Sequence, residues 1–140
     1  MLKVFFILLL MMLVSCVSQP AAKTSLYERI GGKEVLYRIS AETLDRVAED
    51  PKTMRSFDGV KMDLLKESLT NFLCLETGGD CVYEGETMEN SHADAEITIA
   101  EFELMVHAMR EAMDHNNVGT REKNELLKIL APMKRDVVTK

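Results

Sequence analysis

Residues 25–49 read SLYERIGGKEVLYRISAETLDRVAE, and they predict two helices separated by a pair of glycines. Ser25 and Glu28 have the spacing of a capping box, in which two residues satisfy each other's backbone N–H groups at the start of a helix. Gly31-Gly32 then ends this short first helix. A second helix is expected over about residues 33–49, because core-facing residues recur at roughly 3.6-residue spacing until a proline follows. The residues of that face are Leu36, Ile39, Thr43, Leu44 and Val47.

The chain continues with the same helical period after this stretch. A third helix is predicted over residues 62–75, and Gly78-Gly79 ends it. Residues 80–97 contain few periodic apolar residues and predict a loop with one helical turn over 88–93. A loop of this length is uncommon in a compact helical domain and is often functional.

Two more helices are predicted in the last third of the chain. Thr98 and Glu101 form a second capping box, which opens a helix that ends at Asn116-Asn117. The last helix is expected from about Arg121, with a kink at Pro132. No run of alternating apolar and polar residues predicts a strand. The predicted fold class is therefore all-α.

The composition fits one small globular domain. The chain has 140 residues, and 17 Lys+Arg against 23 Asp+Glu give a net charge of −6. This acidic balance argues against nucleic acid as a partner, because the phosphate backbone attracts a basic face. The sequence also contains no glycine-rich phosphate loop and no nucleophile–histidine–aspartate set, which argues against nucleotide-dependent and hydrolytic enzymes.

Residues 1–16 read MLKVFFILLLMMLVSC and resemble a secretion signal. The apolar run over residues 4–14 would rise about 16 Å as a helix, which is too short to cross a hydrocarbon core of about 30 Å. The residues Leu13-Val14-Ser15-Cys16 resemble a bacterial lipobox, which implies cleavage before Cys16 and acylation of its thiol. The alternative is a plain secretion signal with an incidental cysteine.

We therefore expect three parts in the chain. These are a lipoprotein-type signal peptide over residues 1–15, the lipidated Cys16 with a flexible tether over 16–24, and a folded domain over 25–140. More than one acyl chain holds a soluble domain firmly at a bilayer. Because Val17 is not the aspartate that favours inner-membrane retention, the expected location is the cell envelope, at the periplasmic face of the outer membrane.

Several short motifs follow one another in a fixed order along the predicted domain. They are Ser25 to Gly32, Phe57, Gly59, Asn71 to Cys74, Gly78-Gly79, Tyr83, Gly85, Met88, His92-Ala93, Phe102 and Leu126-Leu127. This ordered set resembles the group-one truncated haemoglobins. The resemblance implies a two-over-two helical sandwich around haem b, with His92 as the proximal iron ligand and Phe57 stacked against the haem. A neutral imidazole agrees with this role, because it suits ferrous and ferric iron and leaves the opposite face open.

The resemblance also implies which side chains line the haem. The expected walls are Phe72, Leu73, Met88, Phe102, Val106, Met109 and Leu130. Each of these can equally serve ordinary core packing, because a haem is itself part of the core.

The distal side departs from the family pattern. Many relatives carry a tyrosine in the middle of the second helix and a glutamine or other polar residue on the third, and these donate hydrogen bonds to bound dioxygen. The matching positions are Leu44, Leu65 and Leu69, and Ser68 is the nearest polar alternative. Bound dioxygen carries partial negative charge, so a donor contributes about 1.5–3 kcal/mol. We predict weakly held dioxygen and comparatively favoured carbon monoxide and nitric oxide.

Cys74 and Cys81 enclose a short turn and leave two interpretations open. In an oxidising compartment they can form a disulfide. Alternatively, Cys74 is a small buried residue, as the resemblance to cytosolic relatives implies.

Three functions are compatible with these residues. The first is a haem-based binder of diatomic gases, tethered to a membrane. The second is a haem enzyme, such as a nitric oxide dioxygenase or a peroxidase-like protein, which would need a reductase partner or distal acid–base groups. The third is a haem-free helical interaction lipoprotein. The leucines predicted on the distal side favour the first over the second.

Overall fold

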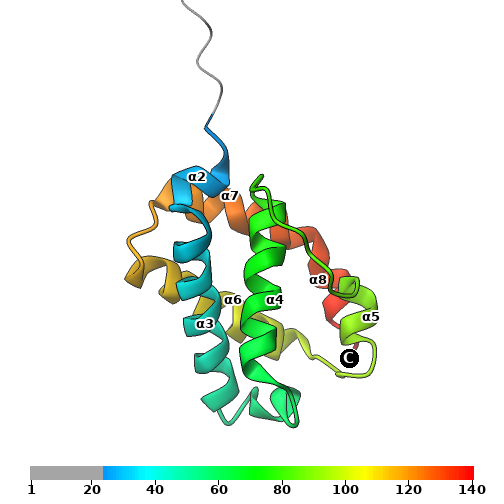
Figure 1. The fold of residues 1–140 in the computed structure, drawn as a ribbon. Coiled ribbons are helices and arrows are strands. Elements are labelled where there is room, and N and C mark those ends of the chain that lie inside the picture. The colour runs from blue at the N-terminus through cyan, green and yellow to red at the C-terminus, as the bar shows by residue number, and fades with distance from the viewer. Residues whose placement is uncertain (1–23) are drawn as a thin grey trace, which may run out of the picture.

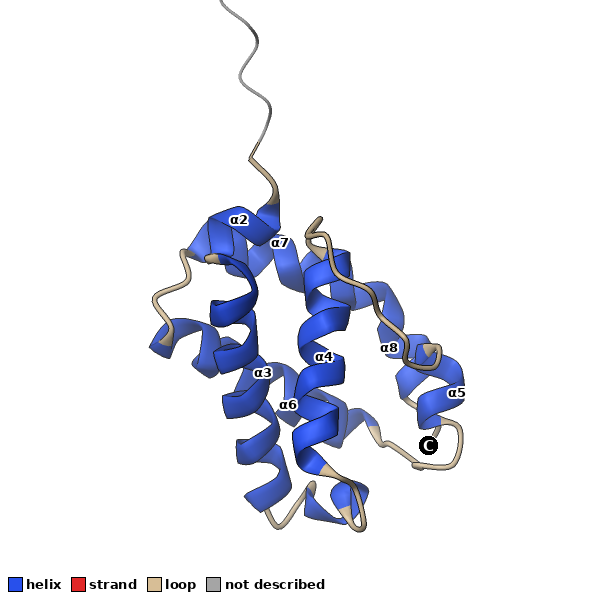
Figure 2. Ribbon diagram, viewed as in Figure 1, coloured by secondary structure: helices blue, strands red, loops and turns tan. Residues whose placement is uncertain are grey.

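The computed structural model describes residues 24–140, and this part of the chain is built from helices and loops without strands (Figure 2). The predicted signal peptide, Cys16 and almost all of the tether lie outside the described residues. The α-helices are α2 (Leu26–Ile30), α3 (Gly32–Glu49), α4 (Met62–Glu76), α5 (Met88–His92), α6 (Ile99–His115), α7 (Thr120–Leu130) and α8 (Lys134–Val137). Two 3-10 turns, η1 (Met54–Phe57) and η2 (Ala131–Met133), join them. None of the described helices has the length and apolar character that crossing a membrane requires.

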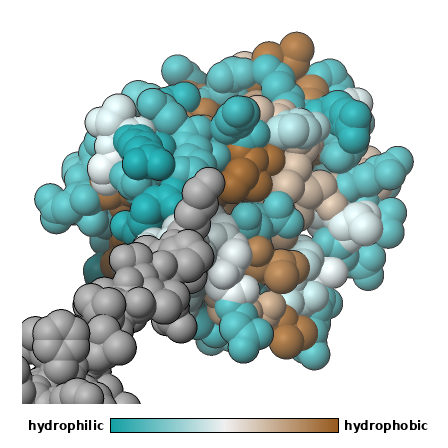
Figure 3. Space-filling model, turned by 90° about the horizontal axis from the view of Figure 1, so that it is seen from above, coloured by the Kyte–Doolittle hydropathy of each residue, from teal (hydrophilic) through white to brown (hydrophobic). Residues whose placement is uncertain are grey.

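The helices form two crossed layers. Figure 1 shows α3 and α4 in front, with α6 and α7 passing behind them, and α3 packs against both α4 and α6. The buried core lies where these layers meet. Its members are Leu26, Ile30, Leu36, Ile39, Phe72, Leu73, Cys74, Met109, Ala112, Met113, Val118 and Leu126. The face seen from above in Figure 3 is mainly polar, with apolar side chains in small groups between polar ones. Leu36 and Ile39, from the apolar face predicted over residues 33–49, lie in the buried core.

Both predicted capping boxes are confirmed. In the first, the Glu28 N–H donates to Ser25 Oγ at 3.2 Å, while the Ser25 N–H donates to Glu28 Oε2 at 2.9 Å. Gly31 then ends α2 with φ at 115°, and a Cβ there would lie 2.6 Å from a methyl of Val35. Only glycine avoids this clash, which explains the sharp turn between α2 and α3.

The last predicted helix is divided rather than simply kinked. Pro132 lies in η2 between α7 and α8, and proline removes a helical N–H donor and crowds the preceding turn. The break lets α8 pack against α5. Behind α8, the Thr139 and Lys140 N–H groups both donate to the carbonyl oxygen of Ile97, at 3.0 and 3.2 Å. The end of the chain is therefore fastened to the loop that follows α5.

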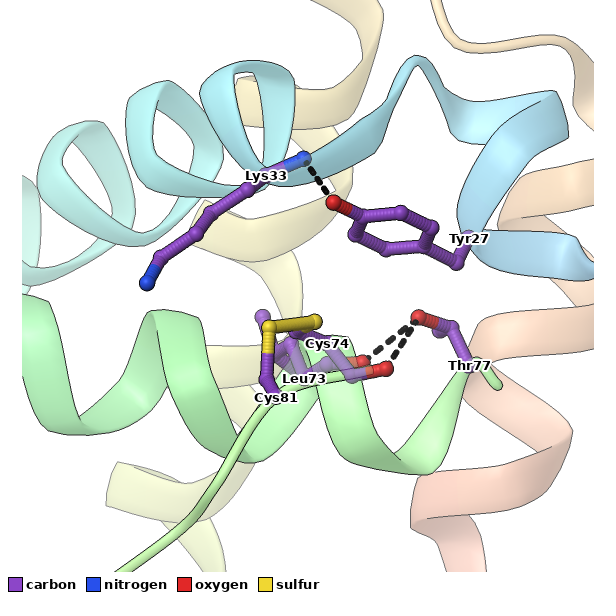
Figure 4. Close-up of a disulfide and its surroundings, with 6 residues drawn as sticks. All are labelled: Tyr27, Lys33, Leu73, Cys74, Thr77 and Cys81. Carbon is purple, nitrogen blue, oxygen red and sulfur yellow. Dashed lines mark hydrogen bonds between the residues drawn. A yellow bond between two sulfur atoms is a disulfide. The ribbon is translucent and has the colours of Figure 1, made fainter. Parts of the chain in front are cut away.

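The structure contains the Cys74–Cys81 disulfide, so the first of the two interpretations is the observed one (Figure 4). Cys74 is fully buried in the last turns of α4, and Cys81 lies in the segment that leads to α5. A Cβ on Gly79 would lie 2.5 Å from Cys74 Sγ and 2.8 Å from the Tyr27 ring. The chain can therefore pass between the disulfide and Tyr27 only because this residue is glycine.

Removing the disulfide is expected to lower the free energy of unfolding by about 2 kcal/mol, because the bridge constrains the unfolded chain. Cys81→Ala breaks the bridge and leaves Cys74 in the core, and urea unfolding would measure the loss. A dithiol reductant should destabilise the natural protein by the same amount and leave Cys81→Ala unchanged. Two titratable thiols at these positions in protein purified without a reductant would contradict the prediction.

Candidate functional site

His92 is the last residue of α5, and its ring is oriented by its own helix. Thr87 begins α5 by accepting the Asn90 N–H on its hydroxyl at 3.2 Å. One turn further on, His92 Nδ1 lies 2.8 Å from the carbonyl oxygen of Met88 and 3.0 Å from Ser91 Oγ. A carbonyl oxygen can only accept a hydrogen bond, so Nδ1 is the donor, and in the neutral ring the lone pair is then on Nε2. This is the tautomer that a metal-ligating histidine needs.

One face of α4 turns toward the segment that leads to α5. Leu65, Leu69 and Phe72 follow at intervals of four and three residues, so they share this face. The Phe72 ring meets the Tyr83 ring edge-on, with centroids 5.3 Å apart. Tyr83 in turn donates to the carbonyl oxygen of Glu86 at 2.8 Å, directly before α5 begins. The segment between α4 and α5 is therefore held against α4 by the disulfide and by Tyr83.

Five of the expected haem walls and the distal residue Leu69 meet at the main core. Phe72, Leu73 and Met109 belong to its buried cluster, and Leu69, Met88 and Leu130 are partly exposed and packed against it. These residues come from α4, α5, α6 and α7. Met88 also begins α5, so the helix that carries His92 rests on the core at its first residue.

The other expected site residues lie outside that cluster. Leu44 is buried in α3, with 2% of its surface exposed. Four further apolar side chains are only half-buried, and they are Phe57, Leu65, Phe102 and Val106. Complete burial of such a side chain is worth about 1.5–3 kcal/mol, so these residues favour a large apolar partner. His92 Nε2, together with the exposed apolar surface of these side chains, fits a porphyrin.

Phe57 also borders an open hollow of about 420 Å³ between the end of α3 and the start of α4. The apolar lining comes from Ala48, Met54, Phe57 and Met62, and the polar lining from Arg55 and Asp58. Phe102 is covered differently, because Lys134 Nζ lies 5.3 Å from the centre of its ring.

The hydroxyl groups beside the distal leucines are bonded within their own helices. Thr43 donates to the carbonyl oxygen of Ile39, and Thr70 donates to that of Lys66, each at 2.6 Å. Ser40, one turn before Leu44 on α3, is fully buried, and its hydroxyl has no hydrogen-bond partner among residues 24–140. The hydroxyl protons of Thr43 and Thr70 are therefore engaged within their own helices, whereas that of Ser40 has no acceptor among the described residues.

Glu101 carries the most strongly shifted carboxyl group in the described part of the chain. Burial opposes ionisation of this carboxylate, but hydrogen bonds from the Thr98 N–H, the Arg55 guanidinium and the Thr98 hydroxyl outweigh it and lower the pKa of Glu101 from 4.5 to about 2. The Arg55 Nη2–Glu101 Oε2 distance is 2.7 Å. The second capping box is thus joined to an ion pair from η1.

Acid should weaken the fold through this carboxylate. Because the pKa of Glu101 is about 2 when folded and 4.5 as the ordinary value, the unfolded chain binds more protons between these limits. The contribution of Glu101 to the free energy of unfolding is complete above about pH 5 and is lost as the pH falls toward 2. We expect this contribution to be about 1–2 kcal/mol. Urea unfolding at several pH values measures it. Glu101→Gln should flatten this part of the pH profile, and an unchanged profile would contradict the assignment.

The described residues contain no group of three His, Cys, Asp or Glu side chains placed to hold a metal ion. A porphyrin, however, supplies four of its iron's ligands and needs only one from the protein. Comparison with known proteins agrees with this reading of the site, because a family model for bacterial-like globins matches residues 25–139. The chain belongs to the bacterial-like globin family.

The relatives of this globin include group 1 truncated hemoglobins. GlbN of Mycolicibacterium paratuberculosis is 29% identical over 119 residues, which cover 85% of this chain and 88% of that protein. GlbN of a Nostoc species is 26% identical over 117 residues, or 84% and 99% of the two chains. The family resemblance inferred from the ordered motifs is therefore confirmed.

Solved structures confirm the two-over-two globin fold. The truncated hemoglobin from Tetrahymena pyriformis in its Fe(III) form superposes with a TM-score of 0.78 at 21% identity, covering 84% of this chain and all of that one (100%). The 2/2 hemoglobin from a Synechococcus species, solved in the cyanomet state with covalently attached heme, gives a TM-score of 0.76 at 22% identity and the same coverage, 84% and 100%.

Proposed function

We propose that this globin binds haem b through His92 and reversibly binds dioxygen, carbon monoxide and nitric oxide at the iron. The observation that carries the proposal is the 2.8 Å contact between His92 Nδ1 and the Met88 carbonyl oxygen, which leaves Nε2 free to ligate. Family membership supports the cofactor, because group 1 truncated haemoglobins are haem-binding globins. When bound, the haem supplies an iron with one coordination position open to a gas.

The side chains of this chain have separate tasks in that function. His92 is held in its ligating tautomer by Met88 and Ser91. Phe57 and the other half-buried apolar residues cover the porphyrin and exclude water. Leu44, Leu65 and Leu69 surround the gas without donating a hydrogen bond, which favours the ligands that need little polar stabilisation.

Absorption spectroscopy tests the cofactor directly. Titration of the purified protein with hemin is expected to give a Soret band that saturates at one hemin per chain, and the reduced form should take up carbon monoxide. A protein that stays colourless and folds equally well without hemin would overturn the proposal.

We also propose that the globin domain is anchored to the envelope by acylation of Cys16, on the periplasmic face of the outer membrane. The lipobox-like residues Leu13-Val14-Ser15-Cys16 support this. The bacterially exported protein should then partition into a detergent phase, and Cys16→Ser should move it to the aqueous phase. Equal partitioning of the two would overturn the anchor and leave the globin assignment untouched.

A further inference from the structure

The loop between α5 and α6, residues 93–98, is bound by the side chain of an arginine that is distant in the sequence. Arg55 lies in η1, and its Nη2 donates to the carbonyl oxygen of Glu96 at 2.8 Å. Its Nη1 lies 3.4 Å from the carbonyl oxygen of Ala95. The same Nη2 pairs with Glu101 Oε2 at 2.7 Å, at the start of α6. One guanidinium therefore binds both the loop and the helix that follows it.

The last two residues of the chain also bind this loop. The backbone N–H groups of Thr139 and Lys140 donate to the Ile97 carbonyl oxygen, and Lys140 Nζ lies 2.9 Å from Glu96 Oε2. Glu96 has a φ of 48°, in the left-handed region that residues other than glycine rarely adopt. Such a conformation persists only where surrounding contacts hold it. The loop is therefore fixed by its contacts rather than by its own preference.

The contacts of Arg55 connect the part of the candidate haem site that contains Phe57 with the part that contains His92. Arg55 is two residues before Phe57, and the loop begins directly after His92. The Glu101 side chain has only 8% of its surface exposed, whereas Arg55 has 51%. Loss of the arginine would leave a buried carboxylate without its cation, which distinguishes this pair from an ordinary surface ion pair.

We propose that Arg55 is a positioning residue that clasps the loop after His92 to the corner carrying Phe57 and so sets how firmly the haem is retained. This inference rests on the proposed haem function. Without Arg55, the carbonyl oxygens of Ala95 and Glu96 lose their donor, and residues 93–98 keep the contacts with the C-terminus and the Thr98–Glu101 capping box. His92 then gains freedom to move away from the iron. The expected result is faster loss of the cofactor rather than loss of the fold.

The test compares Arg55→Met with a matched control, Arg110→Met. Arg110 is exposed on α6 and makes none of the side-chain hydrogen bonds or ion pairs found in residues 24–140. Each variant removes one positive charge, but only Arg55→Met also removes contacts with the loop. Transfer of haem to an excess of apomyoglobin gives the dissociation rate. We expect an increase of about tenfold for Arg55→Met and less than about twofold for Arg110→Met.

Resonance Raman spectra of the ferrous proteins separate positioning from general destabilisation. The iron–histidine stretching band should shift or broaden in Arg55→Met and not in Arg110→Met, and Arg55→Lys, which keeps the charge, should recover part of the retention. If Arg55→Met does not fold, Arg55→Lys carries the test, with a smaller increase in rate expected.

Two results would overturn the proposed role of Arg55. One is haem loss from Arg55→Met at the rate of the control, and the other is faster loss with an unchanged Raman band. Failure of the proposed function is a different result, because the natural protein itself would then show no Soret band with hemin.

Discussion

Replacing His92 with alanine is expected to weaken haem binding by more than about 100-fold, since even residues that only orient a metal ligand contribute 10- to 100-fold. The Soret band of the hemin-loaded protein should shrink or disappear at concentrations that saturate the natural protein. His92 is the only ligand that we assign to the chain, so no second side chain compensates. Added imidazole should restore part of the band by occupying the place of the missing ring.

His107→Ala is the matched control for this change. His107 is an exposed residue on α6 whose Nε2 lies 3.5 Å from Glu111 Oε1, and we assign it no role in haem binding. Hemin should stabilise the natural protein and His107→Ala by mass action, by about 2.7 kcal/mol at a hundredfold excess over the dissociation constant. It should not stabilise His92→Ala comparably. A His92→Ala protein that keeps the full Soret band without imidazole would place the ligand elsewhere.

The local features of the fold could be predicted because neighbouring residues determine them. The capping boxes at Ser25 and Thr98 and the glycine pair at Gly31 depend on side chains within a few residues, and the predicted boundaries of α3 and α4 agree with the structure within a residue. Pro132 likewise predicts a kink in the last helix. The size of that disturbance depends on how α8 packs against α5, which the local sequence does not encode.

The features of the site that were missed depend on backbone atoms or distant contacts. The acceptor for His92 Nδ1 is a carbonyl oxygen, which every residue carries, so no residue type signals it. The Arg55–Glu101 pair joins residues 46 positions apart, and η1 itself has no periodic pattern because it is a single 3-10 turn. Among short-range features, only the Thr87 cap of α5 had a sequence signal that could have been used.

Introducing a hydrogen-bond donor on the distal side should slow dioxygen release by about 10- to 100-fold. Leu44→Tyr places a phenolic hydroxyl at the position where many relatives carry one, and a donor to the partial negative charge of bound dioxygen is worth about 1.5–3 kcal/mol. The neighbouring hydroxyl of Thr43 cannot take this role, because it already donates to the Ile39 carbonyl oxygen. Stopped-flow measurement of dioxygen dissociation gives the rate.

The added size of tyrosine must be separated from its hydroxyl, because Leu44 is buried and a larger ring can cost about 1–3 kcal/mol of stability. Leu44→Phe supplies the same ring without the donor. If the hydrogen bond is responsible, dioxygen should leave Leu44→Tyr much more slowly than Leu44→Phe, while carbon monoxide dissociation, which depends less on a donor, should differ little between them. Equal dioxygen rates in the two variants would mean that ring size, not polarity, controls release. Slow release from the unchanged protein would mean that another donor reaches the gas. Ser40, whose buried hydroxyl has no partner among residues 24–140, would be the first residue to replace, with alanine.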